Sequence, residues 1–191
     1  MLYDTHMHTH HSGDSDAAVQ DMIESAIRKG LDGICLTDHF DYDYPDEPDL
    51  FLLDFDSYYK EIKSYREKYE GRFPILWGVE IGLQPQITDV NKRTASGYPF
   101  DFIIGSSHVV HGVDPYYPKY YEGRTGHEAY LEYFESILEN LHTGADFDVY
   151  GHIDYVVRYG PNRNQDYSYK KYSDVIDEIL RTLIDMGRGI E

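Results

Sequence analysis

Short apolar runs that lead into a histidine or an acidic residue recur along this sequence, with amphipathic segments between them. The runs cover 2–4, 33–36, 74–82, 100–106 and 147–150. Strands that alternate with helices in this way form a largely parallel sheet. Both an open sheet and a closed barrel have this pattern. The polar residues favour the barrel, because the carboxyl ends of the strands converge on one mouth only in a closed barrel. We therefore expect an α/β barrel with its functional site at that mouth.

Apolar residues at helical spacing predict helices between these strands. The first carries Val19 and Ile27, with Asp16 as its N-cap and Gly30 after its end. The second extends from an N-cap at Asp56 to about Gly71, the third begins near Gly126, and the last carries an apolar stripe from Tyr172 to Leu183. The stretches 40–53, 83–99 and 109–125 are predicted to be long loops, which in compact domains are often functional.

The composition indicates one cytoplasmic domain over residues 1–191. Thirty-five acidic residues against seventeen basic ones give a net charge of −18, which argues against nucleic acid or an anionic membrane as a partner. No apolar run approaches the roughly 20 residues that span a bilayer. The single cysteine, Cys35, excludes a disulfide framework and fits a reducing compartment.

The histidines and carboxylates near the run ends have the chemistry of a metal site. His6 and His8 are two residues apart on an extended segment, so both imidazoles can reach one ion. Glu80 is the only carboxylate in an apolar strand, where an ionised side chain needs a cation, and we interpret it as a bridge between two ions. Imidazole and carboxylate ligands without thiolates suit Zn²⁺, Fe²⁺ or Mn²⁺. His10 and His11, beside a turn, are left outside the ligand set.

Five segments in this order, DTHMHTHHSGD, LTDHFD, GVEIG, GSSHVVH and YGHIDYV, resemble the motifs of the PHP (polymerase and histidinol phosphatase) superfamily. The long loop after TDHF, the GVEIGLQP run and the VVRYG segment resemble its histidinol-phosphatase branch more narrowly. The resemblance covers the whole chain. It implies a distorted (βα)7 TIM-like barrel and a phosphomonoesterase that converts L-histidinol phosphate to L-histidinol and phosphate, in histidine biosynthesis.

The resemblance also implies a site of two to three divalent metal ions (Zn, Fe or Mn) that acts on a small phosphomonoester. The implied ligands are His6, His8, Asp14, His39, Glu80, His108 and His152, with Glu80 bridging two ions and with Asp14 and His39 holding a third. Glu80, His39 and Asp38 are expected to act in catalysis, Asp38 by orienting ligand histidines. In so acidic a protein the substrate phosphate needs a local cation, for which Arg158 is the first candidate and Arg163 the second.

The superfamily also has an Asp-x-His pair on its last barrel strand, which has no counterpart here, and Gly189-Ile190-Glu191 predicts the start of another strand. We therefore expect a PHP domain that is truncated at its C-terminus, lacks its last strand or strands, and can self-associate through open sheet edges. Two other readings stay open. One is another PHP-type phosphoesterase, such as a broad phosphatase or a phosphotyrosine phosphatase; the other is a non-catalytic metal-binding barrel fragment.

Overall fold

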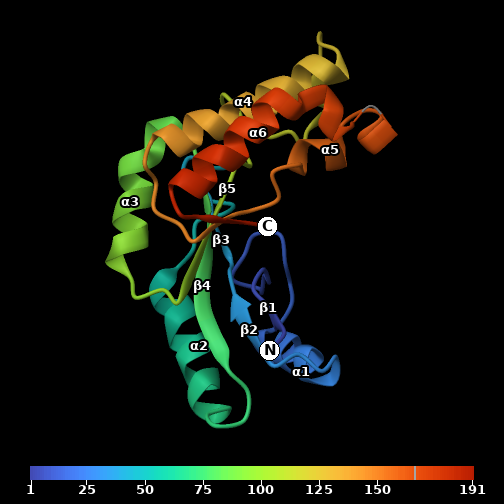
Figure 1. Cartoon of the computed structure of the whole chain (residues 1–191). Coiled ribbons are helices and arrows are strands. Elements are labelled where there is room, and N and C mark those ends of the chain that lie inside the picture. The colour runs from blue at the N-terminus through green and yellow to red at the C-terminus, as the bar shows by residue number, and fades with distance from the viewer. Residues whose placement is uncertain (166) are drawn as a thin grey trace.

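The fold is built on a parallel sheet, in a computed structural model that describes residues 1–165 and 167–191. Its strands are β1 (Tyr3–Asp4), β2 (Gly33–Leu36), β3 (His39–Phe40), β4 (Ile75–Gly82), β5 (Phe102–Ser106), β6 (Val149–Tyr150) and β7 (Gly189–Ile190). The spatial order is β1-β2-β4-β5-β6-β7, with β3 paired to β4, and all these pairings are parallel. The sheet curls but does not close within the described residues (Figure 1), which confirms the expected incomplete barrel of βα units.

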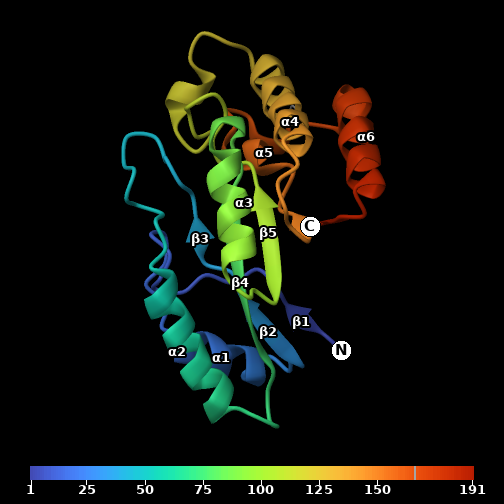
Figure 2. The ribbon, with the colours of Figure 1, turned by 90° about the vertical axis from the view of Figure 1, so that its left-hand side faces the viewer.

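The connections between the strands carry the helices. These are α1 (Val19–Arg28), α2 (Phe55–Lys68), α3 (Thr88–Gly97), α4 (Gly126–His142), α5 (Tyr155–Tyr159) and α6 (Tyr169–Asp185), with 3-10 turns η1 (Pro85–Ile87), η2 (Pro118–Tyr121) and η3 (Arg163–Gln165). Helix α1 packs against β2 and α2 against β4, while α4 and α6 lie side by side at the opposite end of the molecule (Figures 1 and 2). Within the described part of the chain, no helix combines the length and apolarity needed to cross a bilayer.

Strand β4 is the centre of the sheet. It pairs with β2 and then β3 along one edge and with β5 along the other, so its side chains are buried almost throughout. Burial on both faces is typical of a parallel strand and explains its continuous apolar sequence. The fully buried Tyr58 of α2 fixes the helix to this region: its hydroxyl accepts a hydrogen bond from Asp38 N (3.3 Å) and donates one to Gly78 O (3.1 Å).

Two predicted helix caps are wrong, although the helices themselves are confirmed. Helix α2 begins at an N-cap of Asp54, whose Oδ1 accepts a hydrogen bond from Ser57 N at 3.1 Å, and Asp56 lies inside the first turn. Helix α1 begins after Ala18 and has no side-chain cap, so Asp16 lies outside it. Both segments contain several acidic residues close together, and composition alone does not decide which one has the extended backbone of an N-cap.

The prediction of a long loop over 83–99 is also wrong, because most of this stretch is helical. It contains η1 and the ten residues of α3. The buried residues of α3 are polar, namely Asn91 and Thr94, and Asn91 Nδ2 donates a hydrogen bond to Gly82 O at 3.0 Å. A helix that turns polar side chains inward shows no apolar stripe, which is the signal that predicts an amphipathic helix.

Candidate metal centre

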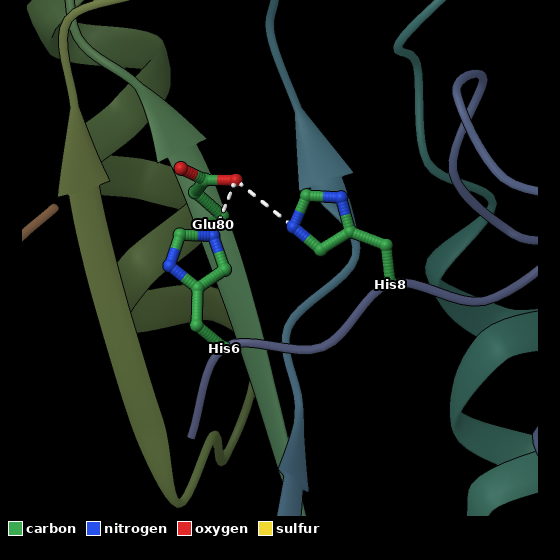
Figure 3. A group of neighbouring side chains, drawn as sticks. All are labelled: His6, His8 and Glu80. Atoms are coloured by element: carbon green, nitrogen blue, oxygen red, sulfur yellow. Dashed lines mark ion pairs between the residues drawn. The ribbon is translucent and has the colours of Figure 1, made fainter. Parts of the chain in front are cut away.

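The loop after β1 presents two histidines to the end of β4. Thr37 fixes this loop, since its N–H donates to Met7 O (2.8 Å) and its hydroxyl oxygen accepts from Met7 N (3.1 Å). His6 and His8 lie on either side of Met7 and both turn toward Glu80 (Figure 3). Their Nε2 atoms are 3.1 and 3.2 Å from Glu80 Oε2. The expected same-side placement of the two imidazoles is therefore present.

Glu80 is the point on which the other ligand candidates converge. Its side chain is fully buried, and Oε1 faces His108 Nε2 at 3.1 Å and His152 Nε2 at 3.0 Å. Oε1 also accepts a hydrogen bond from Ser106 Oγ at 2.7 Å. Burial alone would raise the pKa of this carboxyl, but the charges of His39 and His108 and hydrogen bonds from His108 and His152 hold it well below its usual value. Glu80 is therefore an anion surrounded by imidazoles.

Asp14 and His39 form the remaining side of the cluster. His8 Nδ1 lies 3.3 Å from Asp14 Oδ1, and His39 Nε2 lies 3.7 Å from Asp14 Oδ2. Burial alone would lower the pKa of His39, but the charge of Glu80 and the hydrogen bonds that the ring donates to Asp14 and Asp41 raise it to about 10. All seven residues that the sequence proposes as ligands are thus brought into one cluster.

Asp41 is a member of this cluster that sequence reasoning missed. Its Oδ1 is 2.7 Å from His108 Nδ1 and its Oδ2 is 3.1 Å from His39 Nδ1, so one buried carboxylate orients two imidazoles. The pKa of Asp41 is lowered because the charge of His108 and hydrogen bonds from both histidines outweigh its burial. A Cβ at Gly82 would overlap the Asp41 carboxylate, which explains the glycine at the end of β4. The sequence signal for this contact was the i, i+2 spacing of His39 and Asp41 in the segment DHFD.

Asp38 does not occupy the orienting position expected for it. Its carboxylate accepts hydrogen bonds from Thr9 N (2.5 Å) and from Thr9 Oγ1 (2.9 Å to Oδ2). Asp38 therefore anchors the backbone just after His8, and it is Asp41 that contacts the ring nitrogens. The correction follows from strand alternation, which turns neighbouring residues 38 and 39 to opposite sides.

Glu191 is the second residue that was missed. Its Oε2 lies 2.6 Å from His6 Nδ1, while the Nε2 of the same ring faces Glu80. Burial alone would lower the pKa of His6, but the hydrogen bonds and charges of Glu80 and Glu191 raise it to about 9. The likeness of Gly189-Ile190-Glu191 to Gly78-Val79-Glu80 in the sequence was a signal for this position.

The donor set fits divalent metal ions. Four overlapping groups have ligand atoms within 4.8 Å of one another: His6, His8 and Glu80; His8, Asp14 and His39; His39, Asp41 and His108; Glu80, His108 and His152. His8 Nε2 and Glu80 Oε2 are buried and face each other, yet neither makes a hydrogen bond. Unsatisfied buried polar atoms are costly, and a cation shared between them would remove that cost. Nitrogen and oxygen ligands suit zinc, iron or manganese.

A cavity of about 1050 Å³ opens over this cluster. Its wall includes Arg158 and several tyrosines from the loops after β3 and β5 and from α5, namely Tyr44, Tyr116, Tyr117, Tyr155 and Tyr159. Arg158 makes no ion pair with a described carboxylate. Arg163, the second candidate for phosphate binding, does not line the cavity and lies in η3, one turn beyond α5.

Asp114 organises the tyrosine wall of the cavity. This buried carboxylate accepts hydrogen bonds from Tyr44 Oη (2.6 Å), Tyr155 Oη (3.0 Å) and Tyr116 N (2.7 Å). Burial and the nearby Asp114 charge raise the pKa of Tyr44 and of Tyr155, so both phenols remain neutral donors. The cavity thus combines a cluster of metal ligands, a guanidinium that no described carboxylate pairs with, and a polar aromatic wall.

The chain is similar to known proteins along nearly all of its length. The PHP domain family matches residues 4–191. A probable histidinol-phosphatase of Clostridium acetobutylicum is 36% identical over 191 residues, which cover 100% of this chain and 72% of that protein. The histidinol-phosphatase of Lactococcus lactis subsp. lactis is 29% identical over 98% of this chain and 70% of its own length. A crystal structure of histidinol phosphate phosphatase from Lactococcus lactis, complexed with zinc, L-histidinol and phosphate, matches with a TM-score of 0.94 and 29% identity over 99% of this chain and 72% of that one.

Proposed function

Because the chain belongs to the PHP domain family, we propose that it is a metal-dependent phosphomonoesterase that converts L-histidinol phosphate to L-histidinol and phosphate. The observation that carries this proposal is the buried Glu80, whose two oxygens face five imidazoles at the floor of a cavity. Similarity to histidinol phosphatases of two organisms supports the choice of substrate. The reaction would then be a step of histidine biosynthesis.

We assign two to three divalent ions, zinc being the first choice, to three of the four overlapping ligand groups. His6 and His8 would hold one ion, Glu80 would bridge it to a second ion held by His108 and His152, and Asp14 and His39 would hold a third. When bound, such ions supply hydroxide near neutral pH and neutralise phosphoryl charge. The residues around them orient the ligands: Asp41 acts on His39 and His108, and Glu191 acts on His6.

The protein's own part in substrate binding falls to the cavity wall. Phosphomonoester dianions need positive charge around them, and Arg158 supplies a guanidinium at the cavity. The neutral phenols and the Asp114 carboxylate behind them suit a leaving group that carries an amine and an imidazole.

The proposal is tested by phosphate release from the metal-reconstituted chain across L-histidinol phosphate, phosphotyrosine, phosphoserine and p-nitrophenyl phosphate. The highest kcat/KM is expected for L-histidinol phosphate. Equal rates on all four esters would identify a broad phosphatase instead, and release from none of them would identify a metal-binding domain without this activity. Glu80→Gln should lose activity by more than the roughly 10–100-fold typical for partners of metal ligands. His127→Ala, at an exposed position on α4, is the matched control and should retain activity.

Arg158 provides a separate test of phosphate binding. Arg158→Ala should lower kcat/KM by about 10–100-fold, mainly through KM, because a charge-assisted contact of about 1.5–3 kcal/mol to the phosphate is lost. Arg163→Ala is the matched control, since its side chain does not line the cavity, and it should behave as the unmodified chain does. Equal losses in both variants would show that overall charge, rather than a contact of Arg158, controls binding.

A further inference from the structure

A second group of metal-ligating side chains lies outside the Glu80 cluster, where the loop after β1 meets α2. Glu61 of α2 points to two consecutive histidines of that loop: its Oε2 lies 2.9 Å from His11 Nε2 and 3.4 Å from His10 Nε2. The two imidazole rings are 4.4 Å apart. None of the three residues lines the cavity above Glu80, so the group is distinct from the site described above.

The ligand atoms of this group are close to the spacing that a tetrahedral ion requires: His10 Nε2 lies 3.4 Å from Glu61 Oε2, and His11 Nε2 lies somewhat closer, at 2.9 Å. Zinc bonds of about 2.0–2.2 Å at tetrahedral angles place ligand atoms about 3.3–3.6 Å apart. The three atoms of this group all lie within 4.8 Å of one another, and both nitrogens already face the same carboxylate oxygen. Two imidazoles and one carboxylate are also a complete protein ligand set for a zinc ion whose fourth ligand is water.

The exposure of the group suits an exchangeable ion. The side chain of His11 is 9% exposed and packs against Tyr58, while those of Glu61 and His10 are 30% and 44% exposed. One ligand is therefore held firmly and two are open to solvent, which gives an ion both a fixed anchor and a route of entry. We propose that His10, His11 and Glu61 bind a further divalent ion of the zinc class.

The proposed ion would join the loop after β1 to α2. His10 and His11 lie between His8 and Asp14, which both belong to the Glu80 cluster. Backbone hydrogen bonds already close this segment, from His10 N to Ala17 O at 2.8 Å and from Ser12 N to Thr9 O at 3.0 Å. An ion bound by His10, His11 and Glu61 would also tether this segment to α2, and none of its ligands would line the cavity.

His111 contacts two carboxylates in an arrangement that cannot chelate an ion, so it provides the control for this proposal. Its Nδ1 lies 3.2 Å from Glu132 and its Nε2 lies 3.1 Å from Glu139. The two carboxylates meet opposite edges of one ring, so no single ion can be shared among the three side chains through these atoms. The side chain of His111 is 54% exposed, similar to that of His10.

The test counts zinc, not turnover. The full chain is stripped of metal with a chelator and dialysed to equilibrium at a buffered free zinc concentration, and bound zinc is measured by elemental analysis. The unmodified chain and His111→Ala are expected to bind the same amount. Glu61→Gln and His10→Ala are each expected to bind about one equivalent less, because each removes one of only three protein ligands.

The two variants are chosen so that each substitution disturbs the fold as little as the site allows. Glu61→Gln keeps an amide oxygen that accepts hydrogen bonds from the imidazoles, and Glu61 lies on α2, away from the Glu80 cluster. His10→Ala changes an exposed side chain and decides the question should Glu61→Gln fail to fold. Zinc content equal to that of His111→Ala in both folded variants would overturn the proposal and leave Glu61 as a hydrogen-bonding tether. Because the count does not involve phosphate release, its outcome is independent of the proposed activity.

Discussion

At the scale of single residues, the cluster contains two kinds of side chain: the imidazoles that contact Glu80 and the carboxylates that orient these imidazoles. The former follow directly from the sequence, because each histidine stands at or just after an apolar run. Asp41 and Glu191 do not, since His108 lies 67 residues from Asp41 in the chain and His6 lies 185 residues from Glu191. A sequence shows which residues end each strand, but only the curvature of the sheet decides which of them touch.

Asp41 gives the clearest prediction at this scale. Asp41→Asn should lower zinc affinity by about 10–100-fold, because the amide cannot accept from both ring nitrogens as the carboxylate does. The measurement is a competition titration with a zinc chelator. Asp43→Asn is the matched control: Asp43 lies on the same loop, is exposed, and has a positive φ of 61° that asparagine also tolerates. Equal affinity in the two variants would contradict the orienting role.

At the scale of elements, strands and amphipathic helices are predicted well where burial leaves a regular pattern. The continuous apolar run of β4 and the stripe of α6 are examples, and both are confirmed. Helix α3 was missed because it turns Asn91 toward Gly82 O, so its inner face is polar. The start of α2 was misplaced by two residues, since Asp54 and Asp56 are equivalent in composition and only one has its oxygen at Ser57 N.

The two aspartates of α2 can be told apart by stability. Asp54→Ala should lower the free energy of unfolding by about 0.5–2 kcal/mol, the usual effect of removing an N-cap side chain. Asp56→Ala should cost less, because Asp56 interacts only with the helix dipole from inside the first turn. Urea denaturation of the metal-free variants gives both values. A larger loss of stability for Asp56→Ala than for Asp54→Ala would show that Asp54 is not the residue that caps α2.

At the scale of the whole molecule, a net charge of −18 surrounds a cluster in which imidazoles are held between carboxylates. In the metal-free chain, the pKa of His6 is raised to about 9 and that of His39 to about 10, both above the ordinary value of 6.5. Such groups stabilise the fold fully below about pH 6.5, and this contribution is lost as the pH rises through 9 to 10. Glu80 acts in the opposite sense, since its lowered pKa stabilises the fold above its ordinary value of 4.5.

The presence of zinc should therefore reverse the dependence of stability on pH. Without metal, the free energy of unfolding is expected to fall between pH 6.5 and 9, because the unfolded chain loses the protons of His6 and His39 in this range while the folded chain keeps them. With buffered free zinc it should rise over the same range, because zinc binds the unprotonated imidazoles and ligand binding stabilises the folded state. Denaturation with and without a chelator at several pH values measures both trends. Parallel trends would show that zinc does not bind through these imidazoles.

The parallel order of the strands also has a consequence for how this protein folds. Parallel neighbours cannot form by local hairpins, so every pairing from β1 to β7 must wait for a long loop to close. The Glu80 cluster draws on the segments that follow β1 and β7, so its assembly requires strands that are far apart in the chain to have paired. Before that stage the ten histidines belong to an unfolded polymer and can chelate zinc in non-native combinations. Refolding should accordingly be faster, with a higher yield of native protein, when zinc is added after the chain has folded rather than before.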